Sequence, residues 1–181
     1  IPDNVLQKTK EKGLFGMIIP KEYKGTPFNA HARCKIVEKI GSRSIFLSNT
    51  VMVPNSLGPG ELLLKYGTED QKNYFLPKLS TGEFIPCFGL TGIKSGSDAA
   101  NMEDTGTVIK RDGKLFIELN CNKRYITLAP ISNLVGLAFK LKDPNNLLND
   151  ASTNTNIDQS DLGITLALVE PDKTGNLNNN K

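Results

Sequence analysis

The chain has 181 residues, of which 38% are hydrophobic and 23% are charged, and its formal net charge is +3. This composition excludes a collagen, a coiled-coil rod and a wholly disordered chain. No apolar run is long enough to cross a bilayer, so we expect no transmembrane segment. Lys and Arg are scattered among Asp and Glu, which argues against nucleic-acid binding.

The N-terminus and the cysteines indicate the setting of the protein. The start Ile1-Pro2-Asp3-Asn4 has no signal-peptide pattern and no initiator Met, so we expect a piece of a longer protein. The three separated cysteines, Cys34, Cys87 and Cys121, suit neither a disulfide framework nor a zinc site, and they indicate reduced thiols in a cytoplasmic setting. Membrane association through segments outside this chain stays open. The single histidine, His31, is interpreted as a helix residue at or near the surface.

The first part of the chain has helical periodicity and helix-ending residues. Thr68 and Gln71 have the spacing of a capping box, which predicts a helix from 69 that bends at Pro77 and stops at Gly82. We also expect helices over 3–12, 29–40, 43–52 and 61–66, and an apolar connector with a turn over 14–25.

After Gly82 the pattern changes to strands. The pair Asp112-Gly113 lies between two short apolar runs and predicts a hairpin. The run 134–139 shows little alternation, which predicts burial on both faces. We expect strands over 84–90, 107–110, 115–119, 124–127, 134–141 and 164–169, a polar loop over 143–161 and an Asn-rich tail over 177–181.

Helices followed by strands predict a segregated α+β fold, not an alternating parallel sheet. There is no G-x-G-x-x-G, which weakens a Rossmann interpretation. The stretch Gly92-Ile93-Lys94-Ser95 is similar to the end of a P-loop, but its Lys does not follow its Gly directly and no Gly stands at the required spacing upstream. We therefore reject nucleoside triphosphate binding.

Two stretches could carry chemistry. Residues 88–98 leave a strand and enter a loop of small residues and hydroxyls, which can bring backbone N–H groups close to a ligand. In 122–127, Tyr125 and Thr127 are two apart and would share one face of a strand, as a stacking ring and a hydroxyl. The structural alternatives are a glycine turn with Asp98 as a cap, and ordinary strand-forming residues.

Taken together, these motifs resemble the acyl-CoA dehydrogenase family. The matching residues are Thr91, the run Gly96-Ser97-Asp98, Thr105, and Lys123-Arg124-Tyr125-Ile126-Thr127. Upstream stretches 13–20, 65–72, 76–79 and 82–83 match as well, so the resemblance covers residues 1 to about 170. Stretches 54–63 and 123–130 look most like the large bacterial enzymes of long-chain fatty-acid β-oxidation.

The resemblance implies a fold and a cofactor. It implies part of an N-terminal helical domain over 1–84 and an antiparallel, β-barrel-like middle domain over 85–181, incomplete at its C-terminal end, with the C-terminal helical domain absent. The implied cofactor is FAD. The positions implied to contact the flavin are Phe88, Leu90, Thr91, Tyr125, Ile126 and Thr127, and Ser97 is implied to contact the acyl-CoA.

The implied reaction is α,β-dehydrogenation of a fatty acyl-CoA to the trans-2-enoyl-CoA, with electrons passed to an electron-transferring flavoprotein. The family's glutamate base belongs to a helical domain beyond Lys181, so no catalytic residue is expected here and the chain alone should be inactive. Glu83, Glu103 and Glu118 are interpreted as surface residues. The resemblance also implies a homo-oligomer for the full-length protein.

One departure keeps alternatives open. Most members of the family carry Glu-Pro directly after the Thr, whereas this chain has Gly92-Ile93. An acyl-CoA oxidase that passes electrons to oxygen is one alternative. A scaffold that binds acyl-CoA or protein without catalysis is another, because fold alone does not establish function.

Overall fold

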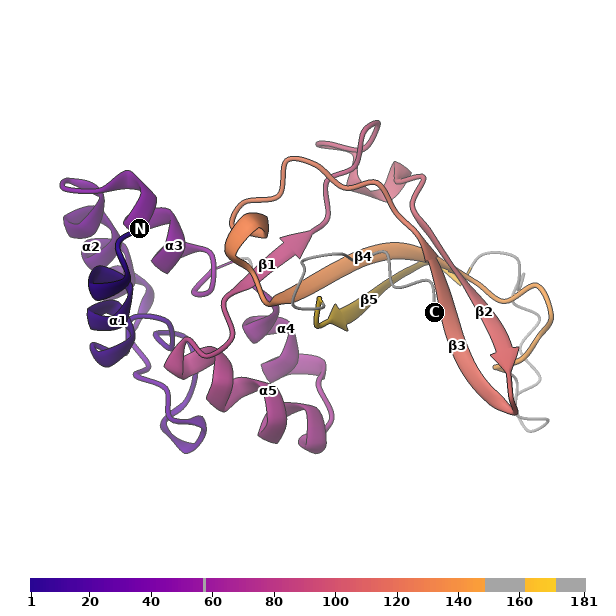
Figure 1. The fold of residues 1–181 in the computed structure, drawn as a ribbon, viewed down its shortest axis with the longest axis horizontal. Helices are drawn as coiled ribbons and strands as arrows, with labels where there is room; N and C mark the ends of the chain where they lie inside the picture. The colour runs from indigo at the N-terminus through magenta and orange to yellow at the C-terminus, as the bar shows by residue number, and fades with distance from the viewer. Residues whose placement is uncertain (57, 149–161, 172–181) are drawn as a thin grey trace. The chain divides into compact units, whose positions relative to one another are not determined.

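The computed structural model describes residues 1–56, 58–148 and 162–171 (Figure 1). Along this part of the chain, five α-helices precede five β-strands, which confirms the predicted segregated α+β class. The helices are α1 (Asp3–Glu11), α2 (Ala30–Gly41), α3 (Ile45–Met52), α4 (Pro59–Tyr66) and α5 (Glu69–Thr81).

The helix ends follow from local capping residues. The Thr68 hydroxyl accepts from the backbone N–H of Gln71 at 3.2 Å, and the Gln71 side chain accepts from the N–H of Thr68 at 3.0 Å, so the predicted capping box is confirmed. Pro77 lies inside α5, and the helix ends at Gly82, whose φ of 72° is left-handed. The Asn29 side chain caps α2 in the same way as Thr68.

The helical part has a core that includes the first strand region. The connector after α1 buries Phe15, Met17 and Ile19 and leads into a 3₁₀ turn over Lys21–Tyr23. Ile19 packs with apolar side chains from α4, from α5, from the segment before the first strand and from residue 134. The core cluster consists of Ile19, Leu63, Leu76, Leu79, Phe84 and Leu134.

The strands are β1 (Pro86–Gly89), β2 (Thr105–Arg111), β3 (Lys114–Asn120), β4 (Leu134–Lys142) and β5 (Ile164–Val169). The sheet order is β1-β4-β2-β3, and β5 also pairs with β4. β2 pairs antiparallel with β3, but it pairs parallel with β4 over 105–107 and 140–142. The sheet is therefore mixed, whereas the resemblance implied an antiparallel one.

The predicted hairpin is present between β2 and β3 (Figure 1). Asp112 and Gly113 have φ values of 49° and 76°, the left-handed values that a two-residue hairpin turn requires. The run 134–139 of β4 is buried along its whole length, as the sequence predicted. β3 is exposed along its whole length and, among the described strands, lies at the edge of the sheet next to β2.

One predicted strand is wrong, one turn was not predicted, and parts of the predicted loop and tail lie outside the described residues. The predicted strand over 124–127 is wrong: only Lys123 forms a bridge, and Leu128 takes a left-handed φ of 68° before a 3₁₀ turn at Ala129–Ile131. A second 3₁₀ turn, Ala99–Asn101, was not predicted. Of the polar loop, residues 143–148 are described, and 149–161 and the tail 177–181 lie outside the described residues.

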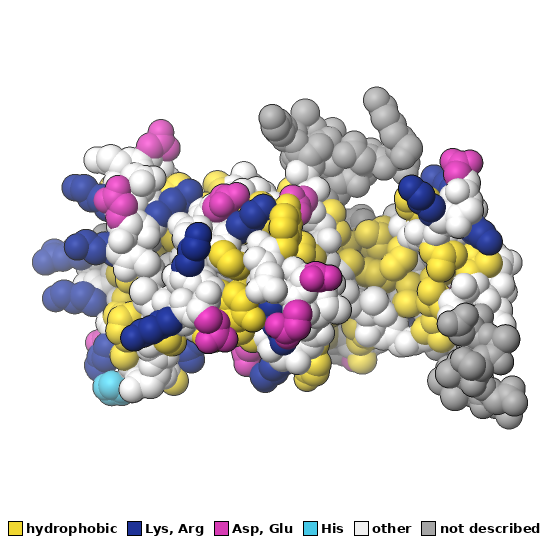
Figure 2. All heavy atoms as spheres, turned by 90° about the horizontal axis from the view of Figure 1, so that it is seen from below, with side chains coloured by type: hydrophobic (Ala, Val, Ile, Leu, Met, Phe, Trp, Pro, Cys, Tyr) yellow, Lys and Arg dark blue, Asp and Glu magenta, His cyan; other side chains and the backbone are white. Residues whose placement is uncertain are grey.

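The chain divides into two compact units. Of the described residues, the first contains 1–56, 58–88, 127–136 and 168–171, and the second contains 89–126, 137–148 and 162–167. In the part of the chain that the structure describes, no helix is long and apolar enough to cross a membrane. Figure 2 shows basic and acidic side chains interspersed on one face, as expected from the sequence. The domain boundary after residue 84 stays a prediction.

Candidate functional site

Within the second unit, residues 89–98 and 122–126 of the two motif-bearing stretches lie side by side. The backbone N–H of Arg124 donates to the carbonyl of Thr91 at 3.1 Å, and Gly92 forms an antiparallel bridge with Lys123. The Lys123 ammonium also donates to the carbonyl of Leu90, with an Nζ–O distance of 2.9 Å. The loop after β1 is therefore held against the segment after β3 by both backbone and side-chain bonds.

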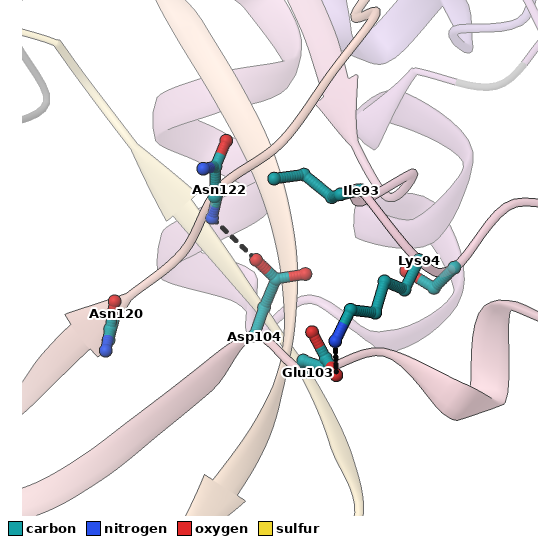
Figure 3. A pocket seen from close by; sticks show the side chains of 7 residues that line it. Ile93, Lys94, Glu103, Asp104, Asn120 and Asn122 are labelled. Carbon is teal, nitrogen blue, oxygen red and sulfur yellow. Dashed lines mark hydrogen bonds and ion pairs between the residues drawn. The ribbon is translucent and has the colours of Figure 1, made fainter.

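A buried ion pair connects these segments to the start of β2. Lys123 Nζ lies 2.6 Å from Asp104 Oδ2, and the two side chains are 8% and 7% exposed. The backbone N–H of Asn122 donates to Oδ1 of the same carboxylate at 2.7 Å (Figure 3). The burial of Asp104 was not predicted, because no local pattern in the sequence distinguishes it from the exposed Asp98 and Asp112.

Gly92 is packed closely by two buried side chains. A Cβ added at Gly92 would lie 2.8 Å from Ser95 Oγ and 3.0 Å from Asp104 Oδ2. Ser95 is buried, and its carbonyl accepts from the Gly92 N–H at 3.0 Å. The hydroxyl of Ser95 and the carboxylate of Asp104 thus fill the space that a side chain at position 92 would enter.

Several of the predicted contact residues are accessible. Tyr125 is 90% exposed, a high value for an aromatic side chain. Thr91, Ser97 and Thr127 are also exposed. Within the described residues, the hydroxyls of these three side chains make no hydrogen bond. The ring and the hydroxyls are therefore available to a ligand.

The other predicted contact residues are partly buried. The ring of Phe88 packs against Gly136 of β4, where an added Cβ would lie 2.8 Å from the ring atom Cδ2. Leu90 and Ile126 are half-buried. Phe88 and Thr127 belong to the first unit, and the remaining predicted flavin contacts belong to the second. Because 124–127 is not a strand, strand alternation does not place Tyr125 and Thr127 on one face, and their roles stay predictions.

A polar pocket of about 250 Å³ lies beside the ion pair (Figure 3). In it, Lys94 points toward Glu103 and their charged groups lie 2.9 Å apart. The pocket is lined by Ile93, Lys94, Ser95, Glu103, Asp104, Asn120 and Asn122. It gives the loop after β1 a solvent-accessible side that is lined by charged, amide and apolar side chains.

The three glutamates that the sequence analysis interprets as surface residues are exposed, and each forms an ion pair. Their partners lie at 4.0, 2.9 and 3.0 Å, in the pairs Glu83–Lys78, Glu103–Lys94 and Glu118–Arg111. A solvated carboxylate next to a cation is a poor base for a carbon acid. This arrangement fits their interpretation as surface residues.

The thiols near the site are held in the neutral form. Burial raises the pKa of Cys121, the negative charge of Asp104 raises it further, and Lys123 opposes both effects. Burial also raises the pKa of Cys87, against a hydrogen bond from Ser132 that lowers it. Because the thiolate is the reactive form, neither cysteine is suited to act as a nucleophile at neutral pH.

Comparison with known proteins identifies the class. Residues 1–83 match the family model described as acyl-CoA dehydrogenase, N-terminal domain. The similarity to individual members extends through the strands. The chain belongs to the acyl-CoA dehydrogenase family, which is a family of oxidoreductases.

Two curated relatives illustrate the range of the family. The chain is 32% identical over 178 residues to a 3-(aryl)acrylate reductase of Clostridium sporogenes, covering 96% of this chain and 41% of that protein. It is 34% identical over 134 residues to the very long-chain specific acyl-CoA dehydrogenase, mitochondrial, of Macaca fascicularis, covering 74% of this chain and 20% of that protein. The chain thus spans less than half the length of these relatives.

A solved structure connects the family to the predicted cofactor. The chain is 29% identical to an acyl-CoA dehydrogenase from Bacillus anthracis that was crystallised in complex with FAD. The two structures superpose with a TM-score of 0.66 over 76% of this chain and 23% of the other. The predicted assignment to an FAD-dependent family is confirmed by this match.

Proposed function

We propose that the protein containing this chain is an FAD-dependent acyl-CoA dehydrogenase of fatty-acid β-oxidation in the cytoplasm. The reaction removes a proton from Cα and a hydride from Cβ of a fatty acyl-CoA and yields the trans-2-enoyl-CoA. In this proposal the chain supplies part of the wall that binds the flavin, and the catalytic base is supplied from outside the chain. The 181-residue chain alone is then inactive.

The observation that carries the proposal is the contact between the two motif-bearing segments. Lys123 reaches the carbonyl of Leu90, and Arg124 reaches that of Thr91, at 2.9 and 3.1 Å. A family motif in isolation is weak support. Two motifs joined at the residues that carry the resemblance are stronger support, because a binding wall needs both at one place.

The exposure of three side chains supports the proposed contact with a planar, hydrogen-bonding ring. The exposed Tyr125 offers a face for stacking, and the hydroxyls of Thr91 and Thr127 have no partner among the described residues. When bound, FAD supplies the acceptor for the hydride. The proposed role of Thr91 and Thr127 is to orient the ring and to donate hydrogen bonds to its edge, which stabilises charge that develops there.

The proposed substrate is a fatty acyl-CoA, with Ser97 as a contact residue. The exposed Ser97 hydroxyl lies in the loop that follows β1 and makes no hydrogen bond within the described residues. The similarity to a very long-chain specific acyl-CoA dehydrogenase supports an acyl-CoA substrate. We further propose an electron-transferring flavoprotein as the electron acceptor, a homo-oligomer, and domains over 1–84 and 85–181.

A second candidate rests on one comparison. The relative from Clostridium sporogenes, which is named a 3-(aryl)acrylate reductase, matches 96% of this chain. Reduction of a carbon–carbon double bond next to a carbonyl is the reverse of the proposed dehydrogenation, so the same flavin wall could serve it. The two candidates differ in substrate: an aliphatic acyl-CoA or an arylacrylate.

The experiment uses the full-length product of the native gene. We expect a yellow protein that converts palmitoyl-CoA to its 2-enoyl product when an electron-transferring flavoprotein is supplied. Peroxide formation without that acceptor would indicate an oxidase, and turnover of cinnamate derivatives alone would indicate the reductase. A colourless protein that cannot take up FAD would overturn the proposal and favour a scaffold.

A pair of matched variants tests the flavin contact. Replacing Thr127 with Val removes a hydroxyl and preserves shape, and we expect weaker FAD binding by about tenfold, the loss of one hydrogen bond. Thr107→Val in β2 removes a half-buried hydroxyl outside the predicted site and serves as the control. Equal FAD affinity in Thr127→Val and the control would remove Thr127 from the proposed site.

A further inference from the structure

Asp104 is bonded to two other segments of the second unit. Its carboxylate accepts from the Lys123 ammonium at 2.6 Å and from the backbone N–H of Asn122 at 2.7 Å. Its own backbone carbonyl accepts from the N–H of Lys140 in β4 at 2.9 Å. The backbone of Asp104 is therefore bonded to β4, and its carboxylate is bonded to the segment after β3.

Lys123 extends this connection to the loop after β1. Its ammonium carries three N–H donors, and two of them are used by Asp104 and the Leu90 carbonyl. The charge of Asp104 thus holds Lys123 in the position from which it reaches Leu90. The adjacent Gly92 packs closely against the same carboxylate, since a Cβ there would come within 3.0 Å of Oδ2.

A buried pair of this kind is a weak source of net stability. Desolvation of both charges offsets most of their attraction, and apolar side chains of similar size often stabilise a fold as well or better. What such a pair does contribute is a fixed geometry, because charged hydrogen bonds fix the distance and direction between the groups that they join. Here the group whose position they fix is the backbone of Leu90 and Gly92.

We infer that Asp104 is a positioning residue of the flavin site, acting through Lys123 on the backbone of the 90–92 loop. This inference rests on the proposed function. Asp104 itself need not touch the flavin or the substrate. It sets where the Leu90 carbonyl and its neighbours stand, and thereby the hydrogen bonds that they offer to the ring.

Two variants separate this role from a general loss of stability. Asp104→Asn keeps the shape of the side chain but removes the charge that holds Lys123. The double variant Asp104→Asn with Lys123→Met removes both charges, so no unpaired charge remains buried. The control is Glu118→Gln, which removes one charge from the exposed ion pair with Arg111 in the same unit, at 3.0 Å.

The experiment applies two measurements to the full-length protein. The first is amide hydrogen exchange of peptides covering 89–98 without FAD, where we expect at least tenfold faster exchange in both variants than in the control. The second is the reduction potential and the visible circular dichroism of the bound flavin, where we expect both to change in the two variants. A role in stability alone would leave the spectrum and the potential of the bound flavin unchanged.

The outcomes are distinct. Unchanged exchange in 89–98, or a flavin with the wild-type spectrum and potential in the double variant, would overturn the positioning role. Failure of the wild-type protein to bind FAD would overturn the proposed function instead, and the exchange measurement would then decide alone whether Asp104 positions the loop.

Discussion

The ion pair between Asp104 and Lys123 allows a quantitative prediction. Both side chains are less than a tenth exposed and their charged atoms lie 2.6 Å apart. Lys123→Met leaves the carboxylate buried with the Asn122 N–H as its remaining donor. Breaking a buried pair in this way costs about 3–5 kcal/mol, because one charge is left without its partner.

The double variant should cost less than the sum of the single variants. Removing both charges leaves no buried ion, so the remaining loss is that of ordinary hydrogen bonds, about 1–2 kcal/mol. Each single variant leaves one charge buried without its partner at a cost of about 3–5 kcal/mol. For Asp104→Asn with Lys123→Met we therefore expect a coupling energy of at least about 4 kcal/mol. The exposed pair of Arg111 and Glu118 should give at most about 1 kcal/mol.

The assay is native-state hydrogen exchange of β2 in the full-length protein, because it reports the opening free energy of the strand that begins next to Asp104. For each ion pair, the wild type, the two single variants and the double variant are compared under one set of conditions. A coupling for the buried pair no larger than that of the exposed pair would refute the reasoning. It would mean that water reaches the carboxylate and screens the charges.

Three further predictions concern single residues. Gly92→Ala should lower the free energy of unfolding by about 1–3 kcal/mol, because the added Cβ enters occupied space. Gly96→Ala is the control: an added Cβ there has no atom within 4 Å, so the free energy of unfolding should hardly change. Both values are measured by urea titration. Thr68→Ala should cost about 1 kcal/mol through loss of the cap of α5, measured as a lower Tm; an unchanged Tm would contradict this. Since burial raises the pKa of the Cys87 thiol, its contribution to stability is present below the unfolded pKa of about 8.5 and falls as pH rises above it. Cys87→Ala should flatten that alkaline decline in unfolding free energy, and Cys34→Ala, at an exposed thiol, should not.

Much of the fold could be predicted because local signals and tertiary structure agree. The capping box at Thr68, the left-handed Gly82 and the Asp112-Gly113 turn are each determined by residues within a few positions of one another. The continuous apolar run of β4 predicted its burial for the same reason. Such signals depend on the backbone requirements of a single element, so no distant contact is needed to interpret them.

The site could be predicted only in part. Motif order indicated the segments around Thr91 and Lys123, but Arg124 to Thr127 read as a strand because Tyr, Ile and Thr favour strands. In the structure this segment bonds to the loop after β1 through Arg124 and continues without a strand partner. The role of Asp104 depends on a partner nineteen positions away, at Lys123. Burial of a charge is a property of the folded arrangement, which no local pattern encodes.

The exposed strand β3 has a consequence for handling the protein. Leu115, Phe116, Ile117 and Leu119 are all exposed, on both faces of a strand that lies at the edge of the described sheet. An edge strand of this kind offers its backbone and its apolar side chains to any other strand that approaches it. Its charged residues, Lys114 and Glu118, are the features that oppose this pairing. Self-association of this chain should therefore increase with concentration and with screening salt, and dilute, low-salt conditions should favour the monomer.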